Sequence, residues 1–356
     1  MIARYNRLSS FLKSSGVDAM LINKPESRRY ITGFTGSAGM VLCDYSCEYR
    51  KLFVDFRYME QASQQASQWE IVKAIQNSLT EIAVQARSAG FKRIGFESDF
   101  ITVDAKTALD NAFADFELVP LKLADLRKEK DENEIRIIET AVEIAEMALN
   151  KVIKEICPGA KERDIAILLE TYMRKAGADG SAFDIIVASG VRSALPHGRA
   201  SDKLIESGDF VTLDFGAYFK GYNSDITRTF VVGKASEKHR VIYDTVLAAQ
   251  LAALQAVRAG VENHSVDKVA RDYITAAGYG ECFGHGLGHG LGMLVHEAPG
   301  LSYAAEPTIL QINNIVTVEP GIYVPGFGGV RIEDDVVVKE NGCEILTSFD
   351  KRLIEL

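Results

Sequence analysis

The stretch VTLDFGAYFKGYNSDITRT, residues 211–229, carries the pattern from which the fold prediction starts. Two mainly apolar arms flank a turn-forming segment, and each arm contains one aspartate, Asp214 or Asp225. If the two aspartates face each other in an antiparallel hairpin, the turn is centred at Phe219-Lys220, next to Gly221. Facing side chains lie about 4.5–5.5 Å apart at Cβ, so we expect both carboxylates on one face of this hairpin.

A second stretch, VTVEPGIYVPGFGGVRIEDD (316–335), repeats this arrangement. Facing positions for Glu319 and Glu333 centre its turn on the glycine-containing segment 326–328. An unpaired carboxylate in an apolar stretch costs several kcal/mol and normally picks up a proton. Two divalent cations would balance four carboxylates, so we predict that the four acids enclose a pair of metal ions. Taken singly, each acid also fits a turn cap or a strand-edge charge, and the prediction depends on the whole set.

A histidine between the two hairpins completes the predicted metal centre. His289 lies in GHGLGHGLG (284–292), where glycines allow the backbone to approach a crowded site. Carboxylates with one imidazole suit manganese, cobalt, zinc or iron. Two such ions would hold a bridging water, lower its pKa and polarise a substrate carbonyl. The expected chemistry is hydrolysis of an amide or an ester.

Three further histidines are candidates for roles beside the metals. His296 lies seven residues after His289, and His197 lies in ALPHGRAS ahead of the first hairpin. Either could hold or protonate a substrate. His285 could orient a metal ligand, and a purely structural role is the alternative for all three.

Composition limits the class of protein. The chain has 356 residues, 47% of them apolar, and a net charge of −9, which argues against nucleic acid or an anionic membrane as partner. Its five cysteines form no CxxC pair, and an odd number favours free thiols in a reducing compartment. The N-terminus has no signal-peptide pattern, and no apolar run approaches the length of a membrane span. We therefore predict a soluble, cytoplasmic protein.

The chain is expected to form two domains. Residues 1–125 alternate short apolar runs with helical patterns, as an α/β domain does. The predicted strands and helices of this domain are 18–23, 51–58 and 92–97, and 59–67 and 78–89, respectively. The polar segment 127–134 marks the boundary, because Asp131 and Glu134 have the spacing of a helix capping box. The second domain is predicted over residues 129–356.

An internal repeat is predicted within the second domain. Its helices are expected at about 135–156, 164–177, 236–258 and 265–278. The distance along the chain from Gly159 to Gly260 equals the distance from Gly177 to Gly278, so the second helix pair repeats the spacing of the first. Strand-rich sequence follows each pair, which predicts two related halves of helix, helix and antiparallel strands.

At these residues the sequence resembles a known family. DFG with a second aspartate eleven residues later, HGxGHGxGxxxHE, VEPGIY and VRIEDD resemble the motifs of the pita-bread metallopeptidases over residues 130–356. GFTGSAG (33–39) and FVDFRYMEQA (53–62) resemble the creatinase-type N-terminal domain of the proline-specific branch, which comprises aminopeptidase P and prolidase. The resemblance implies an α+β fold: a pita-bread domain with pseudo-twofold α/β halves and a smaller α/β N-terminal domain.

The resemblance implies a role for each predicted ligand. Asp214 would bind one metal, Asp225 and Glu333 would bridge both, and His289 would complete one coordination sphere. Glu319 would be a ligand and also the general base toward a bridging hydroxide. We expect two divalent ions, manganese first, with cobalt, zinc or iron as alternatives.

The resemblance also implies supporting residues. His197 and His296 match substrate-contacting or proton-shuttling histidines, and His285 matches a supporting histidine. Arg331 matches an arginine that supports the site, and Thr227 could place a hydroxyl beside the metals.

The implied function is hydrolysis of the Xaa-Pro bond at the N-terminus of peptides, as an Xaa-Pro aminopeptidase. The alternative is an Xaa-Pro dipeptidase, which needs a cation or a wall to receive the proline carboxylate. A more remote alternative is a non-catalytic binding protein on the same fold. The resemblance further implies peptides with proline in second position as substrates, and a homodimer formed through the N-terminal domain.

Overall fold

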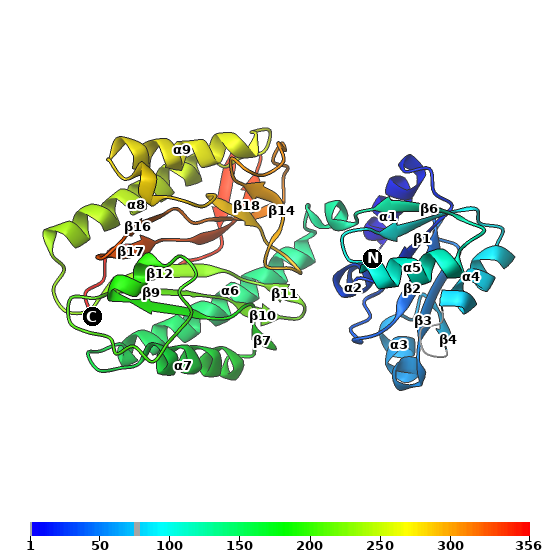
Figure 1. Cartoon of the computed structure of the whole chain (residues 1–356), viewed down its shortest axis with the longest axis horizontal. Coiled ribbons are helices and arrows are strands. Elements are labelled where there is room, and N and C mark those ends of the chain that lie inside the picture. Colours follow the sequence, from blue (N-terminus) through cyan, green and yellow to red (C-terminus); the bar gives the residue numbers. More distant parts are fainter. Residues whose placement is uncertain (1, 75–78) are drawn as a thin grey trace. The chain divides into compact units, whose positions relative to one another are not determined.

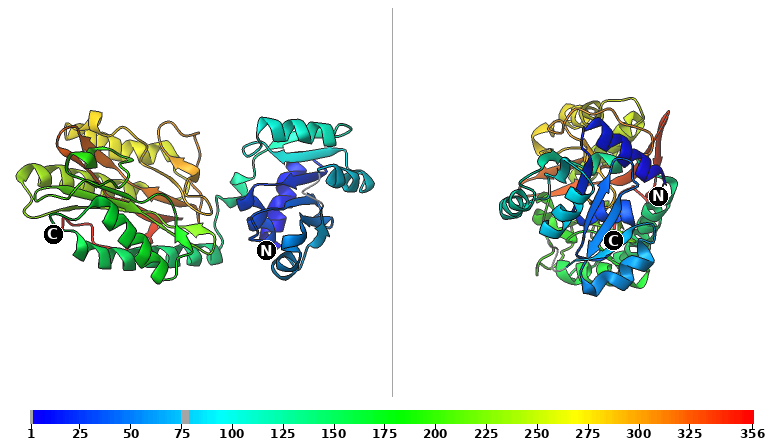
Figure 2. Two further views of the ribbon diagram at one scale, coloured as in Figure 1. Left: turned by 60° about the horizontal axis from the view of Figure 1, so that its bottom comes forward. Right: turned by 90° about the vertical axis from the view of Figure 1, so that its right-hand side faces the viewer.

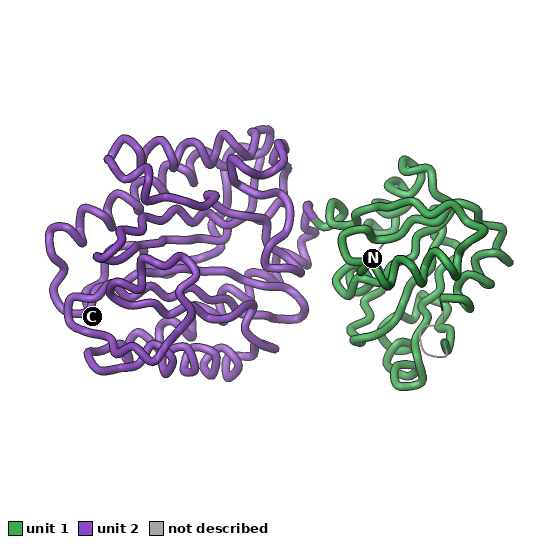
Figure 3. Tube along the Cα trace, in the orientation of Figure 1, with its two compact units in different colours: residues 1–127 green, residues 128–356 purple. Residues whose placement is uncertain are grey.

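The computed structural model describes residues 2–74 and 79–356, and its chain divides into two compact units (Figure 3). Unit 1 is Met1–Arg127 and unit 2 is Lys128–Leu356. Within the described ranges, no helix is both long enough and apolar enough to cross a membrane. All five cysteines are free thiols.

Unit 1 is a six-stranded mixed sheet with helices packed against it (Figure 1). The strand order is β4-β3-β2-β1-β5-β6, in which β1–β2 and β2–β3 are antiparallel and the other pairs are parallel. The strands are β1 (Ala19–Ile22), β2 (Met40–Asp44), β3 (Arg50–Val54), β4 (Glu70–Lys73), β5 (Arg93–Glu97) and β6 (Glu117–Leu121). The helices are α1 (Ile2–Ser14), α2 (Pro25–Thr32), α3 (Met59–Gln65), α4 (Leu79–Ser88) and α5 (Val103–Ala112), with short 3-10 turns η1 (Phe56–Tyr58) and η2 (Ala124–Arg127). Apolar residues of α4 and α5 share one core with the sheet.

The predicted elements of unit 1 are present with adjusted ends. The strand predicted over 51–58 stops at Val54, because the Asp55 side chain accepts a hydrogen bond from the Arg57 amide and starts a 3-10 turn. The helix predicted over 78–89 is α4, and its predicted first residue, Ser78, lies outside the described residues. Strands β2, β4 and β6 were not predicted from the sequence.

Unit 2 contains two pairs of long helices. These are α6 (Glu132–Val152) with α7 (Glu162–Lys175), and α8 (Glu237–Ala256) with α9 (Asn263–Ala276). The Asp131–Glu134 capping box that was predicted from the sequence is present at the start of α6. In Figures 1 and 2 the helices α6 and α7 lie on one side of the strands of unit 2, and α8 and α9 lie on the other. This arrangement confirms the predicted α+β class with two related halves.

Each half of unit 2 has its own apolar core. The first core joins α6 and α7 to strands β8 (Ile186–Ser189), β9 (Phe210–Phe215) and β12 (Ile226–Val231), and contains Leu149, Leu169 and Leu213. The second core joins α8 and α9 to β15 (Ile315–Val318) and β18 (Asp334–Lys339), and contains Val246, Val316 and Val336. The remaining strands are β7 (Gly180–Ser181), β10 (Ala217–Phe219), β11 (Tyr222–Asn223), β13 (Gly288–Gly290), β14 (Glu297–Leu301), β16 (Gly321–Val324), β17 (Gly328–Arg331) and β19 (Gly342–Ile345). The short 3-10 turns are η3 (Ile153–Glu155), η4 (Gly190–Ala194) and η5 (Gly280–Cys282).

The predicted register of the first hairpin is wrong. Asp214 pairs with Thr227, whereas Asp225 lies just before the first residue of β12. The turn is centred on Lys220 and Gly221, which have positive φ angles of 47° and 86°. A two-residue hairpin turn with positive φ at both positions matches the twist of the strands, and it moves the register by two residues relative to the prediction.

The predicted register of the second hairpin is confirmed. Val324 pairs with Gly328 in the β16–β17 ladder, and Val318 pairs with Asp334 in the β15–β18 ladder. In the register of both pairs, Glu319 lies opposite Glu333. These two glutamates fall in the short breaks between the two ladders. The turn falls where it was expected because the chain passes through Gly326 with a φ of 75°.

Candidate metal centre

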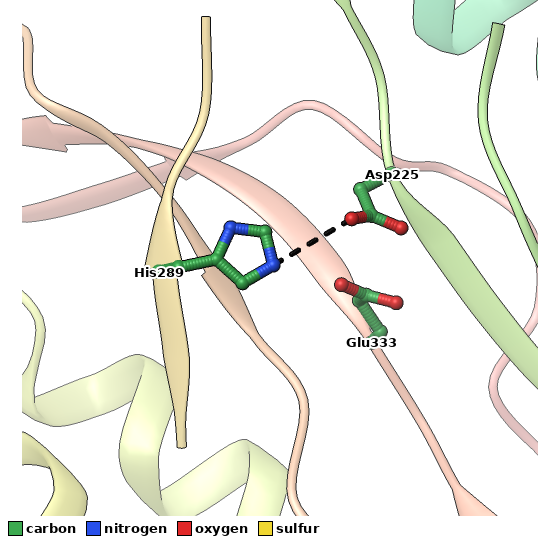
Figure 4. Close-up of side chains that lie close together, drawn as sticks. All are labelled: Asp225, His289 and Glu333. Carbon is green, nitrogen blue, oxygen red and sulfur yellow. Dashed lines mark ion pairs between the residues drawn. The ribbon is translucent and has the colours of Figure 1, made fainter. Parts of the chain in front are cut away.

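Three of the predicted ligands, all in unit 2, point toward one another (Figure 4). Asp225 precedes β12, His289 lies in β13 and Glu333 lies between β17 and β18. One ligand atom from each of the three lies within 4.8 Å of the others. His289 Nε2 is 3.7 Å from Asp225 Oδ2, which is the dashed contact in Figure 4. Segments from both halves of the unit therefore converge at one point.

The other two predicted ligands lie beside these three. Glu319 Oε1 is 3.3 Å from His289 Nε2. Asp214, on β9, lines the same cavity as Glu319, Asp225, His289 and Glu333. The structure thus brings together all five residues that the sequence analysis selected.

Burial without hydrogen bonds distinguishes two of the carboxylates. Among the described residues, Asp225 Oδ1 and Glu333 Oε1 have no hydrogen-bond partner although both atoms are buried. A buried acceptor that lacks a partner is costly, and most buried polar groups in proteins have one. Carboxylate oxygens with an imidazole nitrogen are suitable ligands for a divalent transition metal. The residues therefore fit bound metal ions.

The protonation of these acids leads to the same inference. Burial raises the pKa of Asp225 well above its ordinary value, and the charges of Glu333 and Asp214 raise it further. Burial and the charge of Glu319 likewise raise the pKa of Glu333. Burial also raises the pKa of Glu319, to about 7. Four ionised carboxylates at such short range need positive charge between them, which divalent cations supply.

Arg331 and Thr227 position the acids, as their predicted supporting roles require. The Arg331 guanidinium is buried and donates hydrogen bonds to Asp214 Oδ2 at 2.5 Å and to Thr227 Oγ1 at 3.1 Å. The Thr227 hydroxyl in turn donates to Glu333 Oε2 at 2.6 Å. A chain of short contacts thus fixes the rotamers of Asp214 and Glu333 without closing their remaining oxygens.

Three residues that the sequence analysis missed also shape the site. The Thr317 hydroxyl donates to Glu319 Oε1 at 3.0 Å and accepts from the His289 amide at 3.0 Å. Asp335 Oδ2 accepts from the amide of Asp225 at 2.9 Å, and Asp335 is fully buried. Both residues lie two positions from a predicted ligand, so strand alternation could have revealed them.

The third missed residue is Tyr323, whose hydroxyl joins two predicted supporting residues. It lies 2.7 Å from Arg331 Nη1 and 2.8 Å from His285 Nε2. His285 Nδ1 is 2.7 Å from the carbonyl oxygen of Gly286, which can only accept a hydrogen bond, so this nitrogen carries the proton. Burial and the charge of Arg331 lower the pKa of His285 to about 4. His285 is therefore a neutral group that holds Tyr323 against Arg331.

The glycine-rich segment brings the backbone close to the centre, as predicted. A Cβ atom on Gly288 would lie 2.1 Å from the carbonyl oxygen of Thr317. Real Cβ atoms do not approach backbone oxygens so closely, and strand β13 could not pair beside β15 with any larger residue there. His289 thereby lies next to the strand that leads into Glu319.

The predicted substrate histidines lie in the wall of the cavity. His296 packs edge-on against His289, with ring centroids 4.2 Å apart, and burial lowers its pKa. His197 lines the same cavity, which has a volume of about 770 Å³. The cavity is also lined by the apolar side chains of Phe183, Ile186, Pro196 and Val295. A cavity of this size, lined by both polar and apolar side chains, accommodates a small peptide.

The chain matches two family models that together span most of its length. Residues 136–340 match metallopeptidase family M24, and residues 4–128 match the creatinase/prolidase N-terminal domain. An Xaa-Pro dipeptidase of Pyrococcus horikoshii is 40% identical over 99% of this chain and 99% of its own.

Two solved structures extend this similarity to the whole fold. An Xaa-Pro dipeptidase from Bacillus anthracis superimposes with a TM-score of 0.96 and 48% identity, covering 100% of this chain and 99% of its own. An X-Pro aminopeptidase from Thermotoga maritima gives a TM-score of 0.90 and 41% identity, covering 96% of this chain and 98% of its own.

Proposed function

The chain belongs to metallopeptidase family M24, and we propose that it is an Xaa-Pro dipeptidase, which releases proline from dipeptides. The observation that carries this proposal is that four acids and one histidine line one cavity of peptide size. The named relatives favour the dipeptidase, which was the alternative in the sequence analysis, over the aminopeptidase that was placed first there.

Five residues would hold the metal ions: Asp214, Asp225, His289, Glu319 and Glu333. When bound, two divalent ions lower the pKa of a water molecule and polarise the scissile carbonyl. The choice of manganese, the homodimer formed through the N-terminal domain and the cytoplasmic location stay predictions from the sequence.

The protein's own groups would manage the protons. Glu319, whose carboxylate accepts a hydrogen bond from Thr317, would accept a proton from the attacking water. His296 and His197 lie in the cavity wall, where their ring nitrogens would hydrogen-bond the substrate carbonyl and the departing prolyl nitrogen. Arg331 would keep the Asp214 side chain fixed throughout.

The bond before proline sets a particular demand on recognition. This amide has no N–H, so the enzyme cannot recognise the bond through an amide hydrogen. The rigid pyrrolidine ring instead offers an apolar surface that would pack on Phe183, Ile186 and Val295. Restriction to the first peptide bond follows if the free amine of the substrate binds among the carboxylates.

A comparison of peptide lengths tests the dipeptidase proposal. The purified, metal-loaded enzyme is given an Xaa-Pro dipeptide and an Xaa-Pro-Xaa tripeptide with the same first residue, and product formation is followed by chromatography. We expect a much higher kcat/KM for the dipeptide. Equal or faster cleavage of the tripeptide would instead support the Xaa-Pro aminopeptidase, the second candidate, to which the similarity with the Thermotoga maritima enzyme points.

The remote candidate, a binding protein without catalysis, has its own outcome. It predicts that the purified protein contains no divalent metal and hydrolyses neither peptide. Elemental analysis of the protein separates this candidate from both peptidases.

A further inference from the structure

A dipeptidase must recognise the carboxylate that ends its substrate. In an Xaa-Pro dipeptide this group lies two bonds from the prolyl nitrogen, so its receptor must border the catalytic cavity. A contact that a longer peptide cannot make, or a wall that blocks its extension, separates the two kinds of substrate. A guanidinium is well suited, because its fork matches the two oxygens of a carboxylate.

Two arginines line the described cavity, and one of them already has hydrogen-bond partners within the protein. The buried Arg331 donates to Asp214, to Thr227, to the Tyr323 hydroxyl and, at 3.2 Å, to the carbonyl oxygen of Pro196. These partners use both of its terminal nitrogens as well as Nε. A substrate carboxylate could form two parallel hydrogen bonds with Arg331 only by displacing one of these partners.

The second arginine, Arg199, lies on the exposed rim of the cavity. Its side chain is 79% exposed, and its Nη2 contacts Asp184 Oδ2 at 2.8 Å. The Asp184 side chain is itself 71% exposed and lines the same rim. An ion pair so open to water contributes little, and another carboxylate can replace its acid at little cost.

The backbone at Arg199 is fixed although its side chain is exposed. The carbonyl oxygen of Arg199 accepts a hydrogen bond from Arg192 Nη2 at 2.6 Å. Two residues later, the amide and hydroxyl of Ser201 donate to the buried carboxylate of Glu162 at 3.1 and 2.6 Å. His197, two residues earlier, faces the same cavity. The loop thus holds an exposed guanidinium at a set position beside a histidine of the cavity wall.

We propose that Arg199 receives the C-terminal carboxylate of the Xaa-Pro dipeptide, which replaces Asp184 as its partner. The proposal rests on the dipeptidase function. In the empty site, the charge of Asp184 holds the Arg199 side chain at the rim of the cavity. The same charge repels any carboxylate that does not displace Asp184 from Arg199. A longer peptide places a neutral amide at this point and cannot make the exchange, so Arg199 selects substrates by length.

The test compares an Xaa-Pro dipeptide with its C-terminal amide, in the metal-loaded enzyme and its variants. We expect Arg199→Ala to lower kcat/KM for the free dipeptide about 10- to 100-fold, mainly through KM, since a hydrogen bond to a charged group is lost. The same variant should cleave the amide at the wild-type rate. Asp184→Asn should lower KM for the free dipeptide about 2- to 5-fold, because a competing exposed carboxylate is removed.

Arg163→Ala is the matched control. Arg163 also forms an exposed ion pair, with Asp202 at 3.4 Å, but does not line the cavity, so neither substrate should be affected. Thermal melts of all variants report folding. If the wild type prefers the free dipeptide and Arg199→Ala keeps that preference, the assignment of Arg199 is wrong and the dipeptidase stands. A wild type that cleaves the amide and the free dipeptide equally well overturns both proposals.

Discussion

Removing the metal ions should make the stability of unit 2 fall as the pH rises. In the metal-free protein, burial raises the pKa of Glu319 to about 7 from an ordinary 4.5. The folded chain therefore holds this proton more tightly than the unfolded chain does. The stabilising contribution is complete below about pH 4.5 and is lost as the pH rises through 7.

The size of this effect follows from the two pKa values. Each pH unit between them contributes about 1.4 kcal/mol, so Glu319 accounts for about 3 kcal/mol between pH 4.5 and 7. In a unit of this size, that corresponds to about 6–12 °C in Tm. Asp225, Glu333 and Asp335, whose pKa values burial also raises, change stability in the same direction.

The assay is thermal unfolding in the presence of a chelator at a series of pH values from about 4 to about 8, for the wild type and for Glu319→Gln. Glutamine keeps the oxygen that accepts from Thr317 but cannot ionise. We expect the wild type to lose at least about 3 kcal/mol more than the variant over this range, because Glu319 titrates only in the wild type and its charge also raises the pKa values of Glu333 and Asp335. Added divalent metal should remove the difference by favouring the ionised carboxylate. Parallel pH profiles for the two metal-free proteins would refute the reasoning.

Three further predictions concern the ligands and their supports. Asp225→Asn should leave the fold intact but lower the bound metal measured by elemental analysis, with loss of nearly all turnover, because an amide cannot balance the charge of the ions; full metal content would contradict this role. Thr227→Val removes the hydroxyl that donates to Glu333 at 2.6 Å. We expect metal affinity to fall about 10- to 100-fold, measured by competition with a chelating dye. The control Thr245→Val, on the exposed face of α8, should leave metal affinity unchanged. Gly288→Ala should lower Tm by more than 5 °C, about 2 kcal/mol, because its Cβ would meet the Thr317 carbonyl at 2.1 Å; a melt unchanged from the wild type would show that β13 can move aside.

The candidate site was largely predictable because its residues break the local pattern. Carboxylates within apolar strand sequence are costly, so their presence at Asp214, Glu319 and Glu333 needed an explanation from the sequence alone. The helices of unit 2 were predictable for a related reason: long apolar stripes and the Asp131–Glu134 capping box are local signals. The similarity to family M24 confirms the class of enzyme inferred from these motifs.

Register was predictable only where a turn residue decided it. Gly326 centres the second hairpin, and the expected pairing is observed. In the first hairpin Lys220 adopts a positive φ, which a lysine seldom does, and the pairing moves by two residues. Both hairpins were therefore predicted, but the predicted pairing of Asp214 with Asp225 was wrong.

The tertiary structure alone decided which groups surround the ligands. Thr227 reaches Glu333 across 106 positions of sequence, and Asp335 reaches the amide of Asp225 across 110. Such contacts depend on how two halves with separate cores pack, which no local pattern encodes. The sequence by itself determined that buried acids must gather around positive charge. Folding decided the hydrogen bonds that orient them and the placement of Arg199 at the edge of their cavity, because distance in space is set by packing and not by spacing along the chain.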